Sequence, residues 1–144
     1  MFGALPPECL ELLLQEGRLW QMEKGDWFFK QGDESGKFCI ILSGFIRFYQ
    51  PRERDGKMMP LRLYGVGEQI GFVGMIGLHE RRGDALMEQE GFILEISSDL
   101  FHELCLQLPQ AFQIFLINIA REMSREISQL DQMCTVESPP IIID

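Results

Sequence analysis

The sequence predicts one mainly β domain with helices before and after its strands. A series of short apolar runs, each closed by turn residues such as glycine and aspartate, fills the middle of the chain and is typical of antiparallel strands. Apolar residues recur at helical spacing on both sides of this series. The 144 residues suffice for one domain with a real core and leave little room for a second. Because the strands follow one another too closely for helical crossovers, we expect a sandwich, barrel or roll.

A short amphipathic helix is expected at the N-terminus. It opens at Pro6-Pro7-Glu8, because proline is tolerated in the first turn and a carboxylate there suits the helix dipole. It ends at Gly17, and its buried stripe consists of Leu10, Leu13 and Leu14. From Arg18 onward the apolar spacing changes toward two, which indicates that a β region begins.

Seven strands are expected in the β region. Ser43-Gly44, between two apolar runs, predicts a tight hairpin, and Pro51 to Lys57, which holds Asp55-Gly56, predicts a longer polar one. The expected strands are Leu19–Met22, Trp27–Lys30, Lys37–Leu42, Phe45–Tyr49, Met58–Tyr64, Asp84–Glu88 and Phe92–Ser97.

Two helices are expected after the last strand. The first begins after Ser97-Ser98-Asp99, in which every residue is a competent N-cap. Pro109 ends it and starts the second, which covers residues 110–134 and is the longest helix of the chain. We therefore expect one domain over residues 1–134 and a C-terminal tail over residues 135–144, where two prolines exclude a helix.

The long helix carries a second pattern, which predicts a homodimer. Apolar residues recur at alternating spacings of four and three, as in the a/d seam of a coiled coil. They are Leu116, Ala120, Met123, Ile127, Leu130 and Cys134. The alternative is a helix that packs entirely on its own domain.

Composition narrows the class of protein. A net charge of −9 and a pI near 4.7 argue against binding to nucleic acid, which relies on clustered Lys and Arg. The N-terminus has no basic segment of a signal peptide, and no stretch approaches the roughly 18 apolar residues of a membrane span. A cytoplasmic location is therefore expected.

The residue types that commonly bind metals or catalyse reactions are scattered along the sequence. The four cysteines show no CxxC spacing, so neither zinc nor an iron–sulfur cluster is expected. His79 and His102 are the only histidines, and neither stands in a metal or triad pattern. A cupin-type metal enzyme is therefore disfavoured, and we expect no enzyme activity and no metal. The many phenylalanines are expected in the core, with a pocket for an apolar ligand or haem as the alternative.

Residues 67–84, GEQIGFVGMIGLHERRGD, predict an anion-binding segment. Closely spaced glycines allow backbone N–H groups to approach a ligand. Arg81 and Arg82 at its end offer a bidentate partner for the same anion. The alternative is a loop whose glycines only satisfy turns. The glycines are Gly67, Gly71, Gly74, Gly77 and Gly83.

Three motifs, in their order, resemble one known family. Phe29 to Ser35, FKQGDES, is similar to a turn of the pattern x-x-Gln-Gly-Asp-x-Ser, and Phe38 to Gly44, FCIILSG, to an apolar strand that ends in a glycine turn. Glu95-Ile96-Ser97, followed by Leu100-Phe101, is similar to a closing strand and helix. From Cys9 to Met133 the chain thus resembles the cyclic nucleotide-binding domain of the catabolite activator and fumarate–nitrate regulator family. The resemblance implies a jelly roll of the double-stranded β-helix type.

The resemblance also implies a ligand and its site. In that family the glycine-rich segment is a phosphate-binding cassette around a short helix, where backbone amides and one arginine hold the phosphate of cAMP or cGMP. Gly71 matches the glycine that opens the cassette, and Arg82, or Arg81 by a shift of one residue, matches the arginine. The implied ligand-binding residues are Gly71, Phe72, Val73, Gly74, Arg81, Arg82 and Gly83.

Two positions depart from the family pattern. Phe72 stands where the family has a glutamate that binds the ribose hydroxyl, and we expect its ring to fill volume that the sugar needs. Gly83 and Asp84 stand where the family has Ser or Ala after the arginine. Asp84 would repel a phosphate unless it pairs with Arg81 or Arg82. The alternative hypothesis is that such a salt bridge pins a ligand-free loop.

The resemblance implies a non-catalytic sensory or regulatory domain that acts through a protein partner. One alternative is a degenerate scaffold of the same fold that binds no ligand. Another is the effector domain of a transcription regulator of this family without its DNA-binding domain. Regulators of the family carry a helix-turn-helix after the long helix, and this chain stops about ten residues beyond it, so direct DNA binding is not expected.

Overall fold

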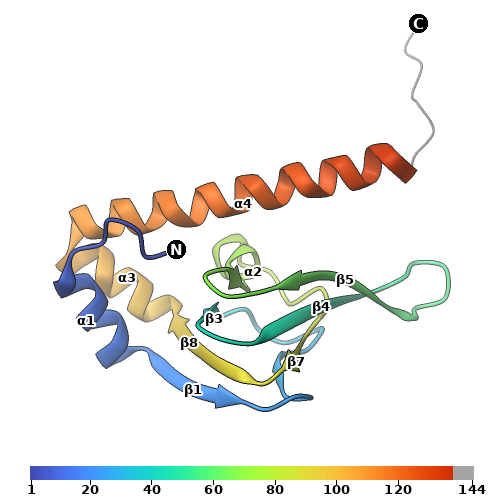
Figure 1. The fold of residues 1–144 in the computed structure, drawn as a ribbon, viewed down its shortest axis with the longest axis horizontal. Helices are drawn as coiled ribbons and strands as arrows, with labels where there is room; N and C mark the ends of the chain where they lie inside the picture. The colour runs from blue at the N-terminus through green and yellow to red at the C-terminus, as the bar shows by residue number, and fades with distance from the viewer. Residues whose placement is uncertain (138–144) are drawn as a thin grey trace, which may run out of the picture.

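The computed structural model describes residues 1–137, with side chains through Met133. Its elements, in chain order, are α1 (Pro7–Glu16), β1 (Arg18–Met22), β2 (Trp27–Phe29), β3 (Lys37–Ile41), β4 (Phe45–Pro51), β5 (Met58–Tyr64), β6 (Gln69–Ile70), α2 (Phe72–Gly77), β7 (Asp84–Gln89), β8 (Gly91–Ser97), α3 (Ser98–Gln107) and α4 (Pro109–Glu137) (Figure 1).

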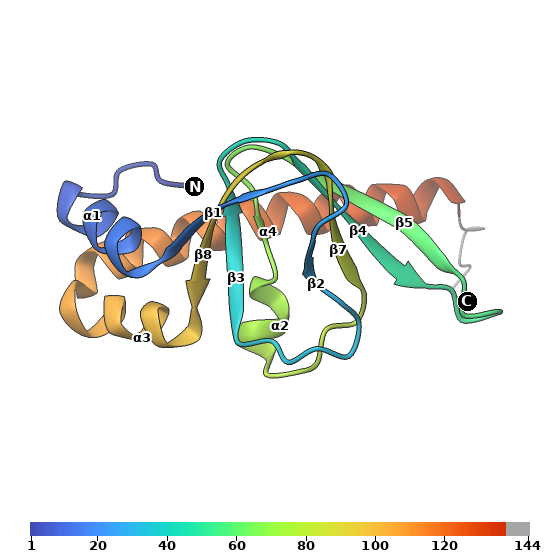
Figure 2. The same ribbon diagram turned by 90° about the horizontal axis from the view of Figure 1, so that it is seen from below.

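The strands form a roll of two four-stranded sheets. One sheet has the order β1-β8-β3-β6 and the other β2-β7-β4-β5, and neighbouring strands pair antiparallel. The helices α1 and α3 gather at one end of the roll, and α4 runs along its whole length (Figures 1 and 2). The predicted mainly β roll with terminal helices is therefore confirmed.

The predicted element boundaries hold within two residues for all seven expected strands. An eighth strand, β6, was missed because it has only two residues, Gln69 and Ile70, which is too short to show a period. Helix α4 begins one residue before the predicted 110–134 and ends three residues after it. Residues 135–137, predicted as tail, thus belong to the helix, and residues 138–144 lie outside the described part of the chain.

The helix ends follow the predicted local chemistry. Ser97 caps α3, with its Oγ accepting the Leu100 N–H at 3.1 Å. Gly17 closes α1, and a Cβ at this position would lie 2.4 Å from the Leu13 carbonyl oxygen. No helix among residues 1–137, α4 included, has an apolar stretch of the length that a membrane crossing takes.

Strand β3 is buried on both faces, which explains its unbroken apolar sequence. Phe38 and Ile40 point toward the helices and pack in a cluster with Phe101 of α3 and Phe115 of α4. Cys39 and Ile41 point between the two sheets, where they pack in a second cluster. The first cluster therefore joins the roll to its terminal helices.

We predict that Phe115→Ala destabilises the domain strongly, because the ring is fully buried between β3 and α3. Removal of a buried phenylalanine ring costs about 3–5 kcal/mol of unfolding free energy. Urea unfolding followed by circular dichroism measures the change. The control is Leu106→Ala in α3, where the side chain is 65% exposed and the free energy should barely change. Equal losses for both variants would contradict this description of the core.

Candidate functional site

A small cavity, here called the cassette cavity, opens in the roll beside α2 and α4. Its volume is about 220 Å³. Five of the seven residues that the sequence implied line it, namely Gly71, Val73, Gly74, Arg81 and Arg82. The other lining residues are Phe29, Phe48, Gln50, Tyr64, Gln69, Ile70, His79 and Glu126.

Arg81 lines this cavity from the inside and is buried, with only 4% of the residue exposed. Its Nη1 donates to the Gly71 carbonyl at 2.7 Å, and its Nη2 donates to the Lys37 carbonyl. The guanidinium lies over the Phe29 ring, 4.2 Å from the centroid, and burial lowers the pKa of Arg81. Nε has no partner among the described residues, so most of the five N–H donors of the group are unused.

Arg82, which the sequence matched first to the cassette arginine, is exposed where it lines the cavity, whereas Arg81, matched by a shift of one residue, is buried. The backbone explains the difference. The Arg81 N–H donates to the Asp33 carbonyl at 2.9 Å, and the Gly32 N–H donates to the Arg81 carbonyl at 2.9 Å. The Gln31-Gly32-Asp33 turn thus holds Arg81 at the start of β7 with its side chain inward.

The glycines around Arg81 give it room. Gly71 precedes α2 with a φ of 101°, in the left-handed region that favours glycine. A Cβ at Gly74 would lie 3.0 Å from Arg81 Nη1 and 2.7 Å from Ser35 Oγ. Gly83 does not line the cavity, and a Cβ there would lie 2.1 Å from the Tyr49 carbonyl oxygen. It therefore serves the close approach of the chain to β4.

Phe72 lies in the core and not in the cavity. Its ring is 4% exposed and packs edge-on against Phe38 and Phe101, with centroids 5.2 Å and 5.5 Å away. The expectation that this ring fills the sugar volume was therefore wrong. The reason is that α2 turns its first side chain toward the cluster of α3 and α4, where an apolar ring gains more by burial.

Asp84 is also used elsewhere. Its Oδ1 accepts the Gln31 N–H at 2.7 Å, and it forms no ion pair with Arg81 or Arg82 within the described residues. The hypothesis that an Arg–Asp salt bridge pins the loop is therefore not supported. The carboxylate instead holds the Gln31-Gly32-Asp33 turn against β7.

The sequence indicated no role for three polar side chains of this region. One lies beside Arg81, and two line the cavity. Ser35 Oγ is buried next to Gly74 without a hydrogen-bond partner among the described residues. Its place in the FKQGDES motif was the available signal. Tyr64 and Glu126 both line the cavity, and the tyrosine hydroxyl donates to the Glu126 carboxylate at 2.5 Å. Burial and this hydrogen bond raise the pKa of Tyr64, so the phenol remains a neutral donor.

A chain of hydrogen bonds links α4 to the cassette. Glu122 of α4, which is 8% exposed, accepts the Gln69 N–H on its Oε1 at 2.8 Å. Gln69 Oε1 in turn accepts the Phe72 N–H at 3.1 Å, at the start of α2. Burial, with the nearby carboxylates Glu68 and Glu126, raises the pKa of Glu122 to about 7 against the lowering effect of the Gln69 N–H.

The histidines and cysteines with described side chains do not cluster into a metal or catalytic site. His79 is half-buried and lines the cavity, with its Nδ1 2.8 Å from the Glu80 carbonyl oxygen, and His102 is exposed on α3. Cys9 and Cys39 are buried free thiols, and burial raises the pKa of both. Within the described residues, no three His, Cys, Asp or Glu side chains are arranged to hold a metal ion.

Part of the seam predicted on α4 faces solvent. Leu116, Ile127 and Leu130 are 38%, 56% and 43% exposed, and Met123 is half-buried. The side chain of Cys134 lies outside the described ones. The helix therefore does not bury its whole apolar surface on its own domain.

The family model for the cyclic nucleotide-binding domain matches residues 19–107. Among curated proteins, the lysophospholipase NTE1 of Cryptococcus neoformans var. neoformans is 25% identical over 107 residues, which is 74% of this chain. The lysophospholipase NTE1 of Chaetomium globosum is 30% identical over 89 residues, which is 62% of this chain. In both cases the match spans only 6% of the relative.

Solved structures share the fold. A cyclic nucleotide-binding domain from Methylobacillus flagellatus superposes with a TM-score of 0.87 at 17% identity, over 99% of this chain and 80% of the other. The c-di-GMP responsive regulator CLP of Xanthomonas campestris gives 0.79 at 19% identity, over 90% and 63%. The catabolite activator protein of Thermus thermophilus gives 0.75 at 24% identity, over 94% and 61%.

We predict that Glu122 makes the domain less stable as the pH rises. Its pKa is raised from 4.5 to about 7 in the folded protein, so the folded state binds the proton more tightly. This contribution is full below about pH 4.5 and is lost as the pH rises through about 7. From pH 5 to pH 8 the wild type should therefore lose on the order of 2 kcal/mol of unfolding free energy relative to Glu122→Gln.

Urea unfolding of both proteins at the two pH values checks this prediction. Glutamine keeps an oxygen that accepts the Gln69 N–H, so the variant should fold. The matched control is Glu11→Gln on the exposed face of α1, which should follow the wild type at both pH values. Parallel pH profiles for the wild type and Glu122→Gln would show that the carboxyl titrates normally.

Proposed function

This chain belongs to the family of cyclic nucleotide-binding domains, and on that premise we propose that it is a non-catalytic sensory domain that binds a cyclic nucleotide in the cassette cavity. Binding is passed through α4 to a protein partner. We also propose a cytoplasmic location and no direct contact with nucleic acid, in keeping with the net charge of −9.

The observation that carries the proposal is the buried guanidinium of Arg81. Only two of its N–H donors are engaged, both by backbone carbonyls, and Nε is without a partner in the described residues. The unpartnered hydroxyl of Ser35 lies beside the same group, as the contacts around Gly74 indicate. A planar guanidinium with free donors matches the oxygens of a phosphate.

The other end of the cavity suits a base. The Glu126 carboxylate is an acceptor, and its hydrogen bond to Tyr64 leaves further lone pairs. Guanine presents two adjacent N–H donors on one edge, whereas adenine presents only one amino group. We therefore propose that cGMP binds more tightly than cAMP. Without a carboxylate at residue 72, the ligand is held by its phosphate and base more than by its ribose.

Ligand binding would move α4, because the cavity is small and directly connected to that helix. Its volume of about 220 Å³ is below the roughly 300 Å³ at which ligand pockets usually begin, so a nucleotide that the cavity encloses must displace a wall. Glu126 forms one wall, and the hydrogen bonds through Glu122 and Gln69 tie α2 to the same helix. A shift of α4 is thus the expected response.

A second candidate function is a scaffold that binds no ligand. The contacts of Arg81 also support this candidate, because the Gly71 and Lys37 carbonyls already accept two of the hydrogen bonds that its guanidinium can donate. The third candidate, the effector domain of a transcription regulator, rests on structures that include the activator of Thermus thermophilus and CLP, of which this chain covers 61% and 63%.

We further propose that the chain forms a homodimer through α4. Support comes from the exposed apolar side chains at coiled-coil spacing, which include Leu116, Ile127 and Leu130. Such a stripe is stabilised when a second helix covers it. The dimer would place the moving element of each domain against its partner.

Calorimetric titration with cGMP and cAMP tests the binding proposal. We expect binding of both, tighter for cGMP, and a loss on the order of 100-fold in affinity for Arg81→Gln, because charge-assisted hydrogen bonds are lost in a buried site. Arg82→Gln is the matched control and should change the affinity only a few-fold, since this side chain is exposed. Circular dichroism of both variants checks that they are folded. No heat from either nucleotide at millimolar concentration would favour the scaffold.

Sedimentation analysis tests the dimer. The wild type should sediment as a dimer at tens of micromolar, and Ile127→Glu should yield monomers, because a charge in an apolar seam is costly to bury. Ser128→Glu is the control, since this exposed neighbour points away from the seam. A monomeric wild type would refute the proposal, as would dimers that Ile127→Glu leaves intact.

A further inference from the structure

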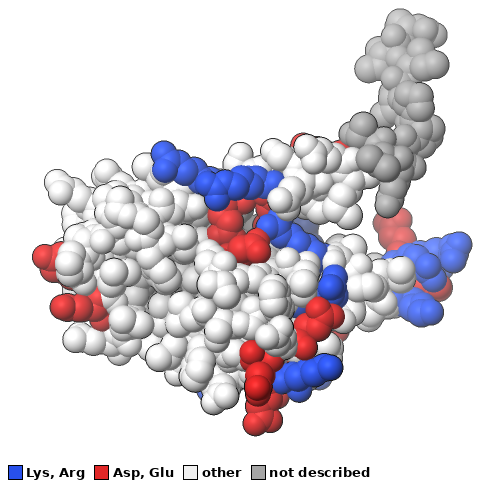
Figure 3. All heavy atoms as spheres, viewed as in Figure 1, with Lys and Arg blue, Asp and Glu red and all other residues white. Residues whose placement is uncertain are grey.

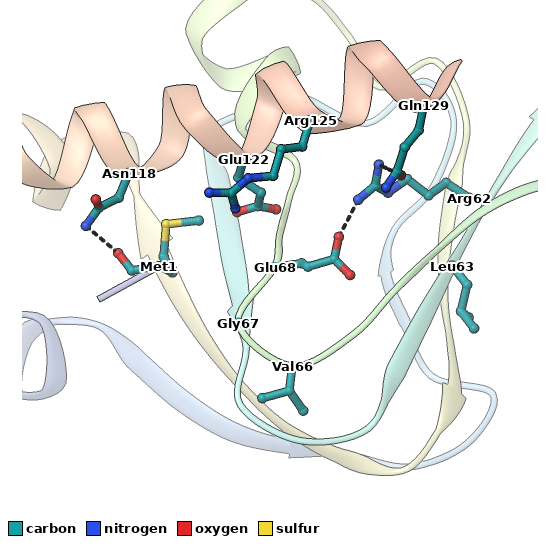
Figure 4. A pocket seen from close by; sticks show the side chains of 10 residues that line it. All are labelled: Met1, Arg62, Leu63, Val66, Gly67, Glu68, Asn118, Glu122, Arg125 and Gln129. Carbon is teal, nitrogen blue, oxygen red and sulfur yellow. Dashed lines mark hydrogen bonds and ion pairs between the residues drawn. The ribbon is translucent and has the colours of Figure 1, made fainter. Parts of the chain in front are cut away.

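A second cavity lies outside the roll, between α4 and the turn that joins β5 to β6, and is here called the α4 groove (Figure 4). It is open to solvent and has a volume of about 600 Å³. Acidic and basic side chains meet in the hollow between α4 and the roll (Figure 3). The polar residues that line it are Asn118, Glu122, Arg125 and Gln129 of α4, with Arg62 and Glu68 opposite.

Glu122 lines this groove and has one unsatisfied oxygen buried just beneath its surface. The residue is 8% exposed, and its Oε1 accepts the Gln69 N–H. Its Oε2 is buried and has no hydrogen-bond partner among the described residues. A buried carboxylate oxygen without a donor is costly, so this atom is suited to accept from a ligand.

Two cations lie near Glu122 without an ion pair among the described residues, namely the N-terminal ammonium of Met1, whose charge acts on Glu122, and the Arg125 guanidinium. Arg62 forms an ion pair with Glu68 and donates to Gln129 Oε1 at 2.9 Å, so these groups satisfy one another. Arg125 is exposed on the groove side of α4 and forms no hydrogen bond or ion pair with the described residues. Because Glu122 and Arg125 are three residues apart, they are neighbours on one helix face. The groove thus offers one free carboxylate oxygen and one free guanidinium side by side.

The groove would stay accessible in a dimer. Asn118, Glu122, Arg125 and Gln129 follow one another at spacings of four, three and four, which places them on one face of α4. At 3.6 residues per turn, the apolar stripe of Leu116, Ala120, Ile127 and Leu130 lies close to the opposite face. A second copy that covers the stripe would leave the groove open.

We propose that the α4 groove is a second ligand site, separate from the cassette cavity, and that it takes a small zwitterion with a primary ammonium and a carboxylate, namely a free α-amino acid. The ammonium donates to Glu122 Oε2, and the carboxylate accepts from Arg125. A simple anion would face Glu122, and a simple amine would leave Arg125 unused, so the zwitterion satisfies both groups. Because Glu122 also holds Gln69, the occupied groove would bear on the cassette.

A thermal-shift screen of the twenty standard L-amino acids, one at a time at millimolar concentration and pH 8, tests the proposal. At that pH Glu122, with a pKa of about 7, is ionised. We expect a subset to raise the melting temperature with dose, and calorimetry on each hit to give its affinity. The N-acetyl derivative and the methyl ester of each hit should bind at least about tenfold more weakly, because each lacks one charge.

Variants locate the site. Glu122→Gln and Arg125→Gln should each weaken a hit about tenfold or more, whereas Arg121→Gln, an exposed arginine of α4 outside the groove, should not. Arg81→Gln should leave amino-acid binding unchanged, so failure of the cyclic-nucleotide proposal is distinguishable from failure of this one. The proposal is overturned if no amino acid binds, if hits survive the Glu122→Gln/Arg125→Gln double variant, or if acetate or ethylamine alone gives the same shift.

Discussion

The guanidinium of Arg81, held inside the roll between the Gly71 and Lys37 carbonyls, is the contact around which the cassette is arranged. A buried cation needs acceptors, and here the backbone supplies them from two sides, one at the start of α2 and one at the start of β3. Gly74 leaves room for the group, and the Gln31-Gly32-Asp33 turn fixes its backbone. These neighbours keep the guanidinium buried at the cavity, where its Nε has no partner among the described residues.

Helix α4 connects this interior to the surface through three different contacts. Phe115 anchors it in the core beneath the helices, Glu122 reaches the cassette through Gln69, and Glu126 forms a wall of the cavity with Tyr64. Its exposed apolar stripe and its polar groove lie on other faces of the same helix. One element therefore carries the core, the candidate ligand contact and two surfaces, so a displacement of α4 would alter all of them.

The fold could be predicted from the sequence because its signals are local. Turn glycines, the Ser97 cap and the apolar runs each determine their own element. Among the described elements, the two-residue strand β6 escaped, and the short helix α2 was expected only through the family resemblance. The site was harder, since it depends on side-chain direction. No local pattern shows which of Arg81 and Arg82 points inward. Arg81 does so because its backbone is hydrogen-bonded to Gly32 and Asp33, about fifty residues earlier. Phe72 shows the same limit, because its position next to Gly71 suggested the cavity while its ring lies in the core. The pairing of Tyr64 with Glu126 joins residues too distant for any sequence pattern to reveal.

The central claim is that Arg81 is the group that receives the phosphate, and nuclear magnetic resonance of its side chain tests this most directly. In ¹⁵N-labelled protein, the Arg81 Nε–H signal, assigned by its loss in Arg81→Gln, can be followed as cGMP is added. If the free donors of this guanidinium bind the phosphate, the signal should shift strongly downfield to a saturating value, with the Arg82 signal little changed. A protein saturated with nucleotide whose Arg81 signal does not move would contradict the claim.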